Sequence, residues 1–300
     1  MEYVLRTVNL NKKFKDKAAV CNINLNVKKG DIYGLIGKNG AGKSTFMKMV
    51  CGMCLPTSGK IVLFERDDLS KGRKRIGSII EAPSFYPSLT AKENLEYCQM
   101  ITNSSNKIEI KKLLELVRLS DSMDKKVREF SLGMKQRLGI AIALIGNIDF
   151  LILDEPINGL DPTGIKEIRE LFLELNEESR TTILISSHIL GELSKIATRY
   201  GVIDNGCLID EFDQKEAMTR YKKYIKLEVD QLEKAKMILE EKMGLYDVTI
   251  DGRNNLSVFA DYEEMGEINK ALIMNDITVN SLSRAGKDIE EYFIYLMGGE

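Results

Sequence analysis

Charge-free segments of membrane-spanning length are missing from this chain of 300 residues. Its longest runs without Asp, Glu, Lys or Arg are about eleven residues, whereas a transmembrane helix needs about 20. An excess of either charge is missing too, because 43 Lys and Arg residues are balanced by 45 Asp and Glu residues. We therefore expect no membrane span within the chain and no blanket basic surface for nucleic acid, although the balance leaves room for a local basic patch.

Cysteine is scarce, with five residues, and histidine occurs once. An odd number of cysteines spread over a long chain favours free thiols in a reducing compartment over a disulfide framework. The first residues, Met1 to Arg6, lack the long apolar core of a secretory signal. A cytoplasmic location is therefore expected. The 44% of apolar residues and 29% of charged residues are typical of a globular fold rather than a disordered chain.

Short apolar segments recur through the first two-thirds of the chain, and they are continuous rather than alternating. Such segments predict strands that are buried on both faces of a parallel sheet. Helical patterns over residues 113–119 and 134–145 lie between them and favour an α/β domain, which we place at residues 1–215. The predicted strands are Ile32–Ile36, Ile76–Ile80, Phe150–Leu153, Thr182–Ser186 and Gly201–Asp204.

The remainder of the chain differs in charge and pattern. Residues 222–300 carry ten basic and sixteen acidic side chains, against 33 and 29 in the residues before them. The periodicity predicts the order βαββαβ, which is that of a small ferredoxin-like α+β module, placed at residues 216–300, with an amphipathic helix over 288–297 after it. The six elements are predicted at 224–229, 232–243, 246–250, 256–259, 263–274 and 277–282.

The glycine-rich sequence GKNGAGKST, residues 37–45, fits the phosphate-loop pattern G-x-x-x-x-G-K-[ST]. It follows a predicted strand and precedes an apolar helix, a context that disfavours the alternative of a glycine-rich turn without a ligand. Backbone N–H groups of such a loop surround phosphate oxygens, and the helix N-terminus adds a positive dipole. Lys43 would reach the β- and γ-phosphates of ATP, and the Ser44 hydroxyl would bind Mg²⁺. The predicted nucleotide-binding residues here are Gly37, Asn39, Gly40, Ala41, Gly42, Lys43, Ser44 and Thr45.

Two acidic residues, Asp154 and Glu155, follow the apolar segment Phe150–Leu153. Acids at a strand end are common in α/β proteins, but a phosphate loop upstream makes a catalytic role the better interpretation. Asp154 would hold Mg²⁺ through its water shell, and Glu155 would act as the general base for the attacking water.

Four further segments stand in a fixed order around these two motifs. Phe14 lies upstream of the phosphate loop, FSLGMKQR at 130–137 precedes the acidic pair, and NGLD at 158–161 and SSH at 186–188 follow it. Over about residues 1–215 the set resembles the ATP-binding-cassette (ABC) ATPases. The resemblance implies a P-loop ATPase domain with a parallel sheet core, an antiparallel β part and a helical lobe.

The resemblance also implies roles for individual residues. Phe14 matches the aromatic residue that stacks on adenine, and Asp161 belongs to the loop that joins two nucleotide sites. Ser131 and Gly133 match the signature loop, which closes over the γ-phosphate held by a second subunit. His188 matches the histidine that contacts the γ-phosphate and organises Glu155.

The signature segment has a physical reading of its own. Ser131 stands at an N-cap position before an apolar helix, and the free N–H groups of that helix form an anion site. One chain cannot easily present two helix N-termini to one γ-phosphate from opposite sides. A two-fold, head-to-tail homodimer with two buried ATP molecules can.

One position departs from the family pattern. Glu81 stands where the family usually has Gln at the end of the strand after the phosphate loop. An ionised Glu only accepts hydrogen bonds and adds negative charge, so it would bind Mg²⁺ more strongly and repel the γ-phosphate. The bacitracin- and lantibiotic-export subgroup, which this chain resembles, likewise has Glu there. We expect Glu81 to sense Mg²⁺ and to couple the site to a partner.

These observations favour the ATPase subunit of an ABC exporter. A separate membrane permease would be its partner, docked to a helical lobe over residues 82–129, and the subunit would lie on the inner face of the membrane. Subgroup resemblance suggests an antimicrobial peptide or a drug as cargo. The alternative is a soluble ABC ATPase acting on nucleic acid or ribosomes. A single cassette without basic extensions argues against that alternative, and no nucleic-acid partner is expected.

Overall fold

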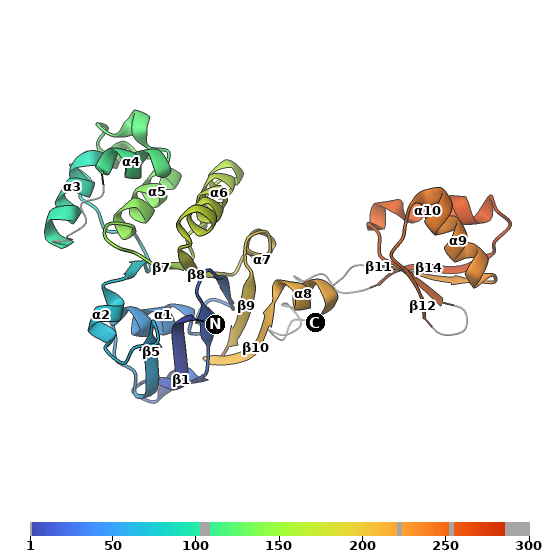
Figure 1. Ribbon diagram of the computed structural model, residues 1–300, viewed down its shortest axis with the longest axis horizontal. Coiled ribbons are helices and arrows are strands. Elements are labelled where there is room, and N and C mark those ends of the chain that lie inside the picture. The colour runs from blue at the N-terminus through green and yellow to red at the C-terminus, as the bar shows by residue number, and fades with distance from the viewer. Residues whose placement is uncertain (1, 103–108, 221–223, 252–254, 286–300) are drawn as a thin grey trace. The chain divides into compact units, whose positions relative to one another are not determined.

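The computed structural model describes residues 2–102, 109–220, 224–251 and 255–285. The chain divides into two compact units, Met1–Gln214 and Lys215–Glu300 (Figure 1). The predicted helix over 288–297 lies outside the described residues.

A six-stranded sheet in the order β10-β9-β4-β8-β7-β6 forms the centre of the first unit. Strands β9, β4, β8, β7 and β6 run parallel, and β10 pairs antiparallel with β9 at the edge. Every residue of β4, β7 and β8 is buried, which confirms the prediction of strands covered on both faces. The strands span Ile32–Ile36 (β4), Ile76–Ile79 (β6), Phe150–Asp154 (β7), Thr182–Ser187 (β8), Arg199–Asp204 (β9) and Cys207–Asp213 (β10).

A second, antiparallel sheet is built on the long strand β1, which pairs with β2, β3 and β5. One continuous core joins it to the parallel sheet, because Leu5 of β1, Phe46 of α1 and Phe150 of β7 belong to the same buried cluster. Helix α1 is therefore held on both sides, and the phosphate loop before it starts from a rigid base. The elements are Tyr3–Phe14 (β1), Lys17–Ile23 (β2), Asn26–Lys28 (β3), Ser58–Leu63 (β5) and Lys43–Cys51 (α1).

Helices α3, α4 and α5 gather into a lobe, shown in green in Figure 1, and α5 packs on β6. The prediction of a helix over 113–119 was wrong at its end, because Arg118 adopts a left-handed φ of 56° and the helix stops before it. The helices span Leu69–Arg73 (α2), Ala91–Thr102 (α3), Ile110–Leu116 (α4), Leu132–Ala143 (α5), Pro162–Ser179 (α6) and Leu190–Leu193 (α7), with 3₁₀ turns at Ser120–Ser122 and Val127–Glu129.

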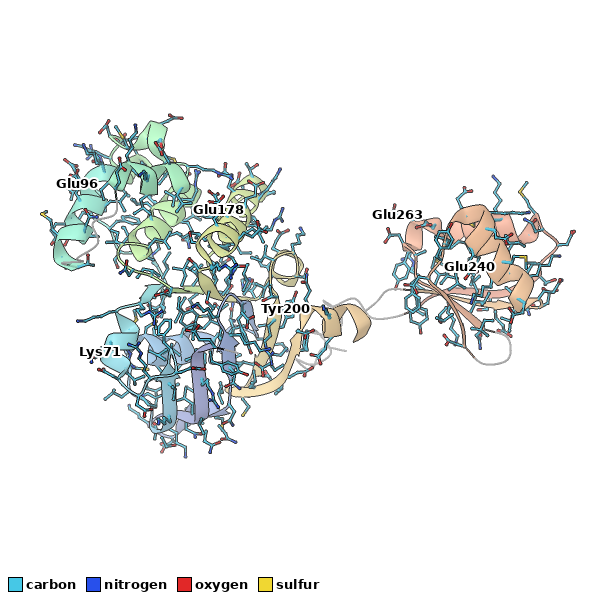
Figure 2. The ribbon with its side chains drawn as sticks, in the orientation of Figure 1. Lys71, Glu96, Glu178, Tyr200, Glu240 and Glu263 are labelled. Carbon is cyan, nitrogen blue, oxygen red and sulfur yellow. The ribbon has the colours of Figure 1, made fainter. Side chains whose placement is uncertain are left out.

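Two aromatic rings pack together where β10 pairs with β9 at the edge of the parallel sheet. Tyr200 of β9, labelled in Figure 2, is buried and stacks on Phe212 of β10 with 5.3 Å between the ring centroids. Burial raises the pKa of the Tyr200 hydroxyl to about 12. Helix α8 (Gln214–Arg220) follows β10. Among the residues described, no helix combines the length and apolarity needed to cross a bilayer.

The second unit has the predicted βαββαβ order, and its sheet is antiparallel throughout in the order β12-β13-β11-β14. Helices α9 and α10 share one core with the sheet, including Leu227, Leu239 and Ile268. This is the ferredoxin-like arrangement expected from the sequence. The elements are Tyr224–Val229 (β11), Leu232–Met243 (α9), Val248–Asp251 (β12), Asn255–Val258 (β13), Met265–Ile273 (α10, after a 3₁₀ turn at Tyr262–Glu264) and Val279–Ala285 (β14).

Candidate nucleotide-binding site

The phosphate loop connects β4 to α1 and fits tightly between its neighbours. A Cβ on Gly37 would lie 2.3 Å from the carbonyl oxygen of Ile203, and one on Gly42 would lie 2.4 Å from that of Ala19. Gly42 also has a φ of 107°, which only glycine adopts readily. The conformation of the loop therefore depends on these glycines, while its tip at Asn39 is exposed.

Lys43 begins α1 and is folded back under this loop, with 4% of its surface exposed. Its Nζ donates to the carbonyl oxygen of Gly37 at 2.7 Å and to that of Lys38 at 3.3 Å. The same ammonium lies 3.1 Å from Oε1 of Glu155. The lysine is thus fixed at the place where a loop-bound phosphate would meet the acidic strand end.

The acidic pair follows β7, and the neighbouring strand β8 holds it in place. Ser186 Oγ donates to Asp154 Oδ1 at 2.6 Å and accepts a hydrogen bond from the Glu155 backbone N–H at 2.9 Å. Glu155 has a φ of 50°, and its Oε2 lies 2.7 Å from Nδ1 of His188. The parallel register pairs Asp154 with Ser186, so the carboxyl ends of the two strands bring these side chains together.

Sequence reasoning assigned no role to Ser186, although it belongs to the SSH segment. The signal that finds it is the strand register, because a serine paired across from a strand-end aspartate is within hydrogen-bonding reach. The structure identifies Ser186 as the residue that holds the carboxylate of Asp154 and the backbone of Glu155.

Glu81 comes two residues after the end of β6 and has a left-handed φ of 71°. Its side chain is 70% exposed and its Oε1 lies 2.5 Å from Nζ of Lys48, which is on α1 one turn after Ser44. The hydrogen bond to Glu81 is the main cause that raises the pKa of Lys48, and the negative charge of Asp154 adds to it. Sequence reasoning missed Lys48, because nothing in the chain order shows that α1 faces the end of β6.

Three predicted residues lie at helix starts, where their contacts are local. Ser131 is the exposed N-cap of α5 and its Oγ accepts from the Met134 N–H at 3.3 Å, as predicted. A Cβ added to Gly133 would meet only Leu160, at 3.9 Å, so the start of α5 is open to approach. Asp161 caps α6 in the same way as Ser131, accepting from the Gly164 N–H at 3.2 Å.

Phe14 ends β1 and its ring is 52% exposed. The ammonium of Lys12 lies 4.8 Å from the ring centroid. A half-exposed aromatic ring with a cation nearby can receive a planar ligand by stacking.

This combination of a phosphate loop after one parallel strand and a braced acidic pair after another defines the class of P-loop nucleotide hydrolases. The comparison with protein families agrees, since residues 20–158 match the ABC transporter family. The bacitracin transport ATP-binding protein BcrA of Enterococcus faecalis is 42% identical over 303 residues, which cover 100% of this chain and 98% of that protein. The lantibiotic transport ATP-binding protein SrtF of Streptococcus pyogenes is 44% identical over 215 residues, 71% of this chain and 93% of SrtF.

Solved structures give the same result. The dimeric structure of the ATP-binding cassette MJ0796 in a post-hydrolysis state, bound to ADP and Pi, is 26% identical with a TM-score of 0.62. The matched region covers 70% of this chain and 98% of the MJ0796 chain. The chain therefore belongs to the ATP-binding proteins of ABC transporters, and it is an ATPase whose hydrolysis of ATP powers transport. These relatives do not favour the alternative of an ATPase acting on nucleic acid or ribosomes.

Proposed function

We propose that this chain is the ATPase subunit of an exporter for antimicrobial peptides, in which a homodimer of the chain drives a separate membrane permease. The names of the relatives BcrA and SrtF support this cargo class. We place the ATPase domain at residues 1–215 and an accessory module at 216–300, with the subunit peripheral to the inner face of the membrane.

The observation that carries the proposal is the contact of Lys43 and His188 with the two oxygens of Glu155, at 3.1 and 2.7 Å. In this arrangement the lysine holds the carboxylate. A bound triphosphate would attract Lys43 to its β- and γ-phosphates, and Glu155 would then be available to accept a proton from the attacking water. His188 would keep the carboxylate oriented and contact the γ-phosphate.

The residues at the carboxyl ends of the parallel strands also fit Mg²⁺. Asp154 is 6% exposed and is held by Ser186, and Ser44 in the first turn of α1 carries a hydroxyl, so the donors are oxygens, as Mg²⁺ prefers. The described residues hold no cluster of three or more His, Cys, Asp or Glu that could form a metal cage of its own. This suits an ion that is bound by one or two protein groups together with substrate phosphates. When bound, Mg²⁺ would neutralise charge on the phosphates, with Glu81 as a further contact.

The open start of α5 supports the proposed homodimer. Ser131 is exposed, and the space beside the Cα of Gly133 is open up to Leu160. The helix N-terminus can therefore accept a phosphate from a second subunit. Asp161, at the start of α6, would join the two sites. In such a head-to-tail pair each site would take its phosphate loop from one copy and its signature helix from the other. Phe14 would stack on the adenine ring of ATP.

Docking of the permease is supported by the apolar surface that follows Glu81. A hollow beside β6 and α5 is lined in part by Ile80, Ala82 and Pro83. Tyr86 and the α3 residues Met100 and Ile101 are exposed in the helical lobe. Exposed apolar groups of this kind are typical of a surface that a partner covers. The C-terminal module would support the dimer or regulate it.

The proposal is tested by identifying the membrane protein that co-purifies with the chain and expressing the two together in a peptide-sensitive host. Cells should tolerate more bacitracin or lantibiotic, and the purified complex should hydrolyse ATP. The same complex carrying Glu155→Gln should give no protection. A partner that proves to be a nucleic acid or a ribosome, with no change in peptide tolerance, would contradict the proposal.

A further inference from the structure

Helix α1 supplies two lysines to the edge of the nucleotide site, and each is paired with a glutamate that follows a parallel strand. Lys43 pairs with Glu155 after β7, and Lys48 pairs with Glu81 after β6. Both glutamates have a left-handed backbone, with φ of 50° and 71°. The first pair is largely buried, whereas the second is open to solvent, with 34% of Lys48 and 70% of Glu81 exposed.

An ionised Glu81 raises a problem of charge at this site. Asp154 and Glu155 already bring two carboxylates to the sheet edge, and a nucleotide triphosphate adds several negative charges. Lys43 cannot compensate Glu81, because its ammonium contacts Glu155 and two loop carbonyl oxygens. Among the residues that the structure describes, the cation in contact with Glu81 is Lys48.

The position of Lys48 is set by the core. Its neighbours Met47 and Met49 are fully buried, so the core fixes the backbone of α1 at this point. From this fixed backbone the long side chain of Lys48 reaches Glu81. On the other side of Glu81, Pro83 packs against α5, because a Cβ on Gly139 would lie 2.4 Å from that of Pro83. The ion pair therefore joins the phosphate-loop helix to the segment that contacts the signature helix.

We propose that Lys48 is a positioning residue whose charge neutralises Glu81 and holds it beside the nucleotide site, so that a carboxylate can stand there without repelling ATP. This inference rests on the proposed binding of ATP and Mg²⁺. The ion pair explains how this chain accommodates the charge of Glu81. A neutral side chain at the same position would need no counter-charge.

The test is a double-mutant cycle on ATP affinity, measured with a fluorescent ATP analogue in EDTA and again in Mg²⁺. Lys48→Met should weaken binding in EDTA by about tenfold, because Glu81 is left uncompensated. The loss should shrink in Mg²⁺, since the divalent ion supplies positive charge near the carboxylate. In the Glu81→Gln background, Lys48→Met should change affinity less than about twofold. Lys48→Arg should bind ATP like the wild type.

The matched control is Lys60→Met, which removes another lysine of an exposed ion pair, 2.7 Å from Asp67, and should not change affinity. If Lys48→Met weakens binding equally in the wild-type and Glu81→Gln backgrounds, Lys48 acts on the nucleotide itself and the inference is wrong. It is also wrong if Lys48→Met has no effect in either buffer while the wild type binds ATP. A wild-type chain that binds no ATP would overturn the proposed function, and this inference with it.

Discussion

The two halves of the nucleotide site are built in different ways. In the phosphate-loop half, Lys43 and His188 each contact Glu155, and Ser186 bonds the carboxylate of Asp154 and the backbone N–H of Glu155, so these groups are held within one chain. In the signature half, Ser131 is exposed, and the hydrogen bond that its side chain makes among the described residues lies within its own helix start. One half is preformed, and the other is the exposed start of a helix.

The difference follows from the sheet. Parallel strands bring their carboxyl ends to one edge, so β4, β7 and β8 place the loop and the acids together without any partner. Helix α5 belongs to the helical lobe instead. Its N-terminus is open, because a Cβ on Gly133 would meet only Leu160, at 3.9 Å. Mutations in the first half should therefore act on a single subunit, whereas mutations in the second should act only when two subunits meet.

The largest effect should come from Glu155→Gln. The amide cannot accept a proton from water, so ATP turnover should fall about a thousandfold while ATP still binds. A dimer should accumulate with ATP, visible by light scattering. The control is Glu178→Gln, an exposed glutamate on α6 labelled in Figure 2, which should leave turnover unchanged. Full turnover in the Glu155 variant would remove Glu155 as the general base.

Lys43→Ala should weaken ATP binding by about a hundredfold even in a monomer, because a charged contact to phosphate is lost and Glu155 loses the ammonium that lies beside it. Equilibrium binding measures this. The control is Lys71→Ala on α2, labelled in Figure 2, whose lysine pairs with Asp68. Normal affinity in the Lys43 variant would contradict the preformed half-site.

Gly133→Asp places a negative charge at the second residue of α5. The open space before Gly133 should accommodate the side chain, so ATP affinity of the single subunit should be unchanged. Dimer formation and turnover should fall by at least about tenfold, since the charge opposes a phosphate arriving from the partner. Gly266→Asp, at the second residue of α10 and equally open, is the control. Weaker binding by the single subunit would show that the two halves are not separate.

Phe14→Ala should have the smallest effect. Losing one stacked ring should weaken ATP binding about fivefold without changing turnover at saturating ATP. Phe14→Tyr keeps the ring and should bind like the wild type. If both variants bind equally well, Phe14 does not contact adenine, and the phosphate-loop half depends on phosphate contacts alone.

The sequence predicted much of the fold, because buried parallel strands have a continuous apolar pattern and the phosphate loop has an explicit one. The five central strands and the βαββαβ order of the second unit were found this way. The end of the helix at residue 116 was not, since the left-handed turn at Arg118 leaves no glycine signal. Ser186 and Lys48 were not found either, because their roles depend on which strands and helices are neighbours.

Residue order alone therefore establishes the chemistry available to this chain: a loop that can enclose phosphate, a strand that ends in two acids, and a helix that opens with a serine. Folding decides which of these groups meet. The register of β7 against β8 brings Ser186 to Asp154, and the packing of α1 directs Lys48 to Glu81. Such contacts join residues about 30 positions apart, and a distance of that kind is set by sheet topology and core packing, which local sequence patterns do not encode.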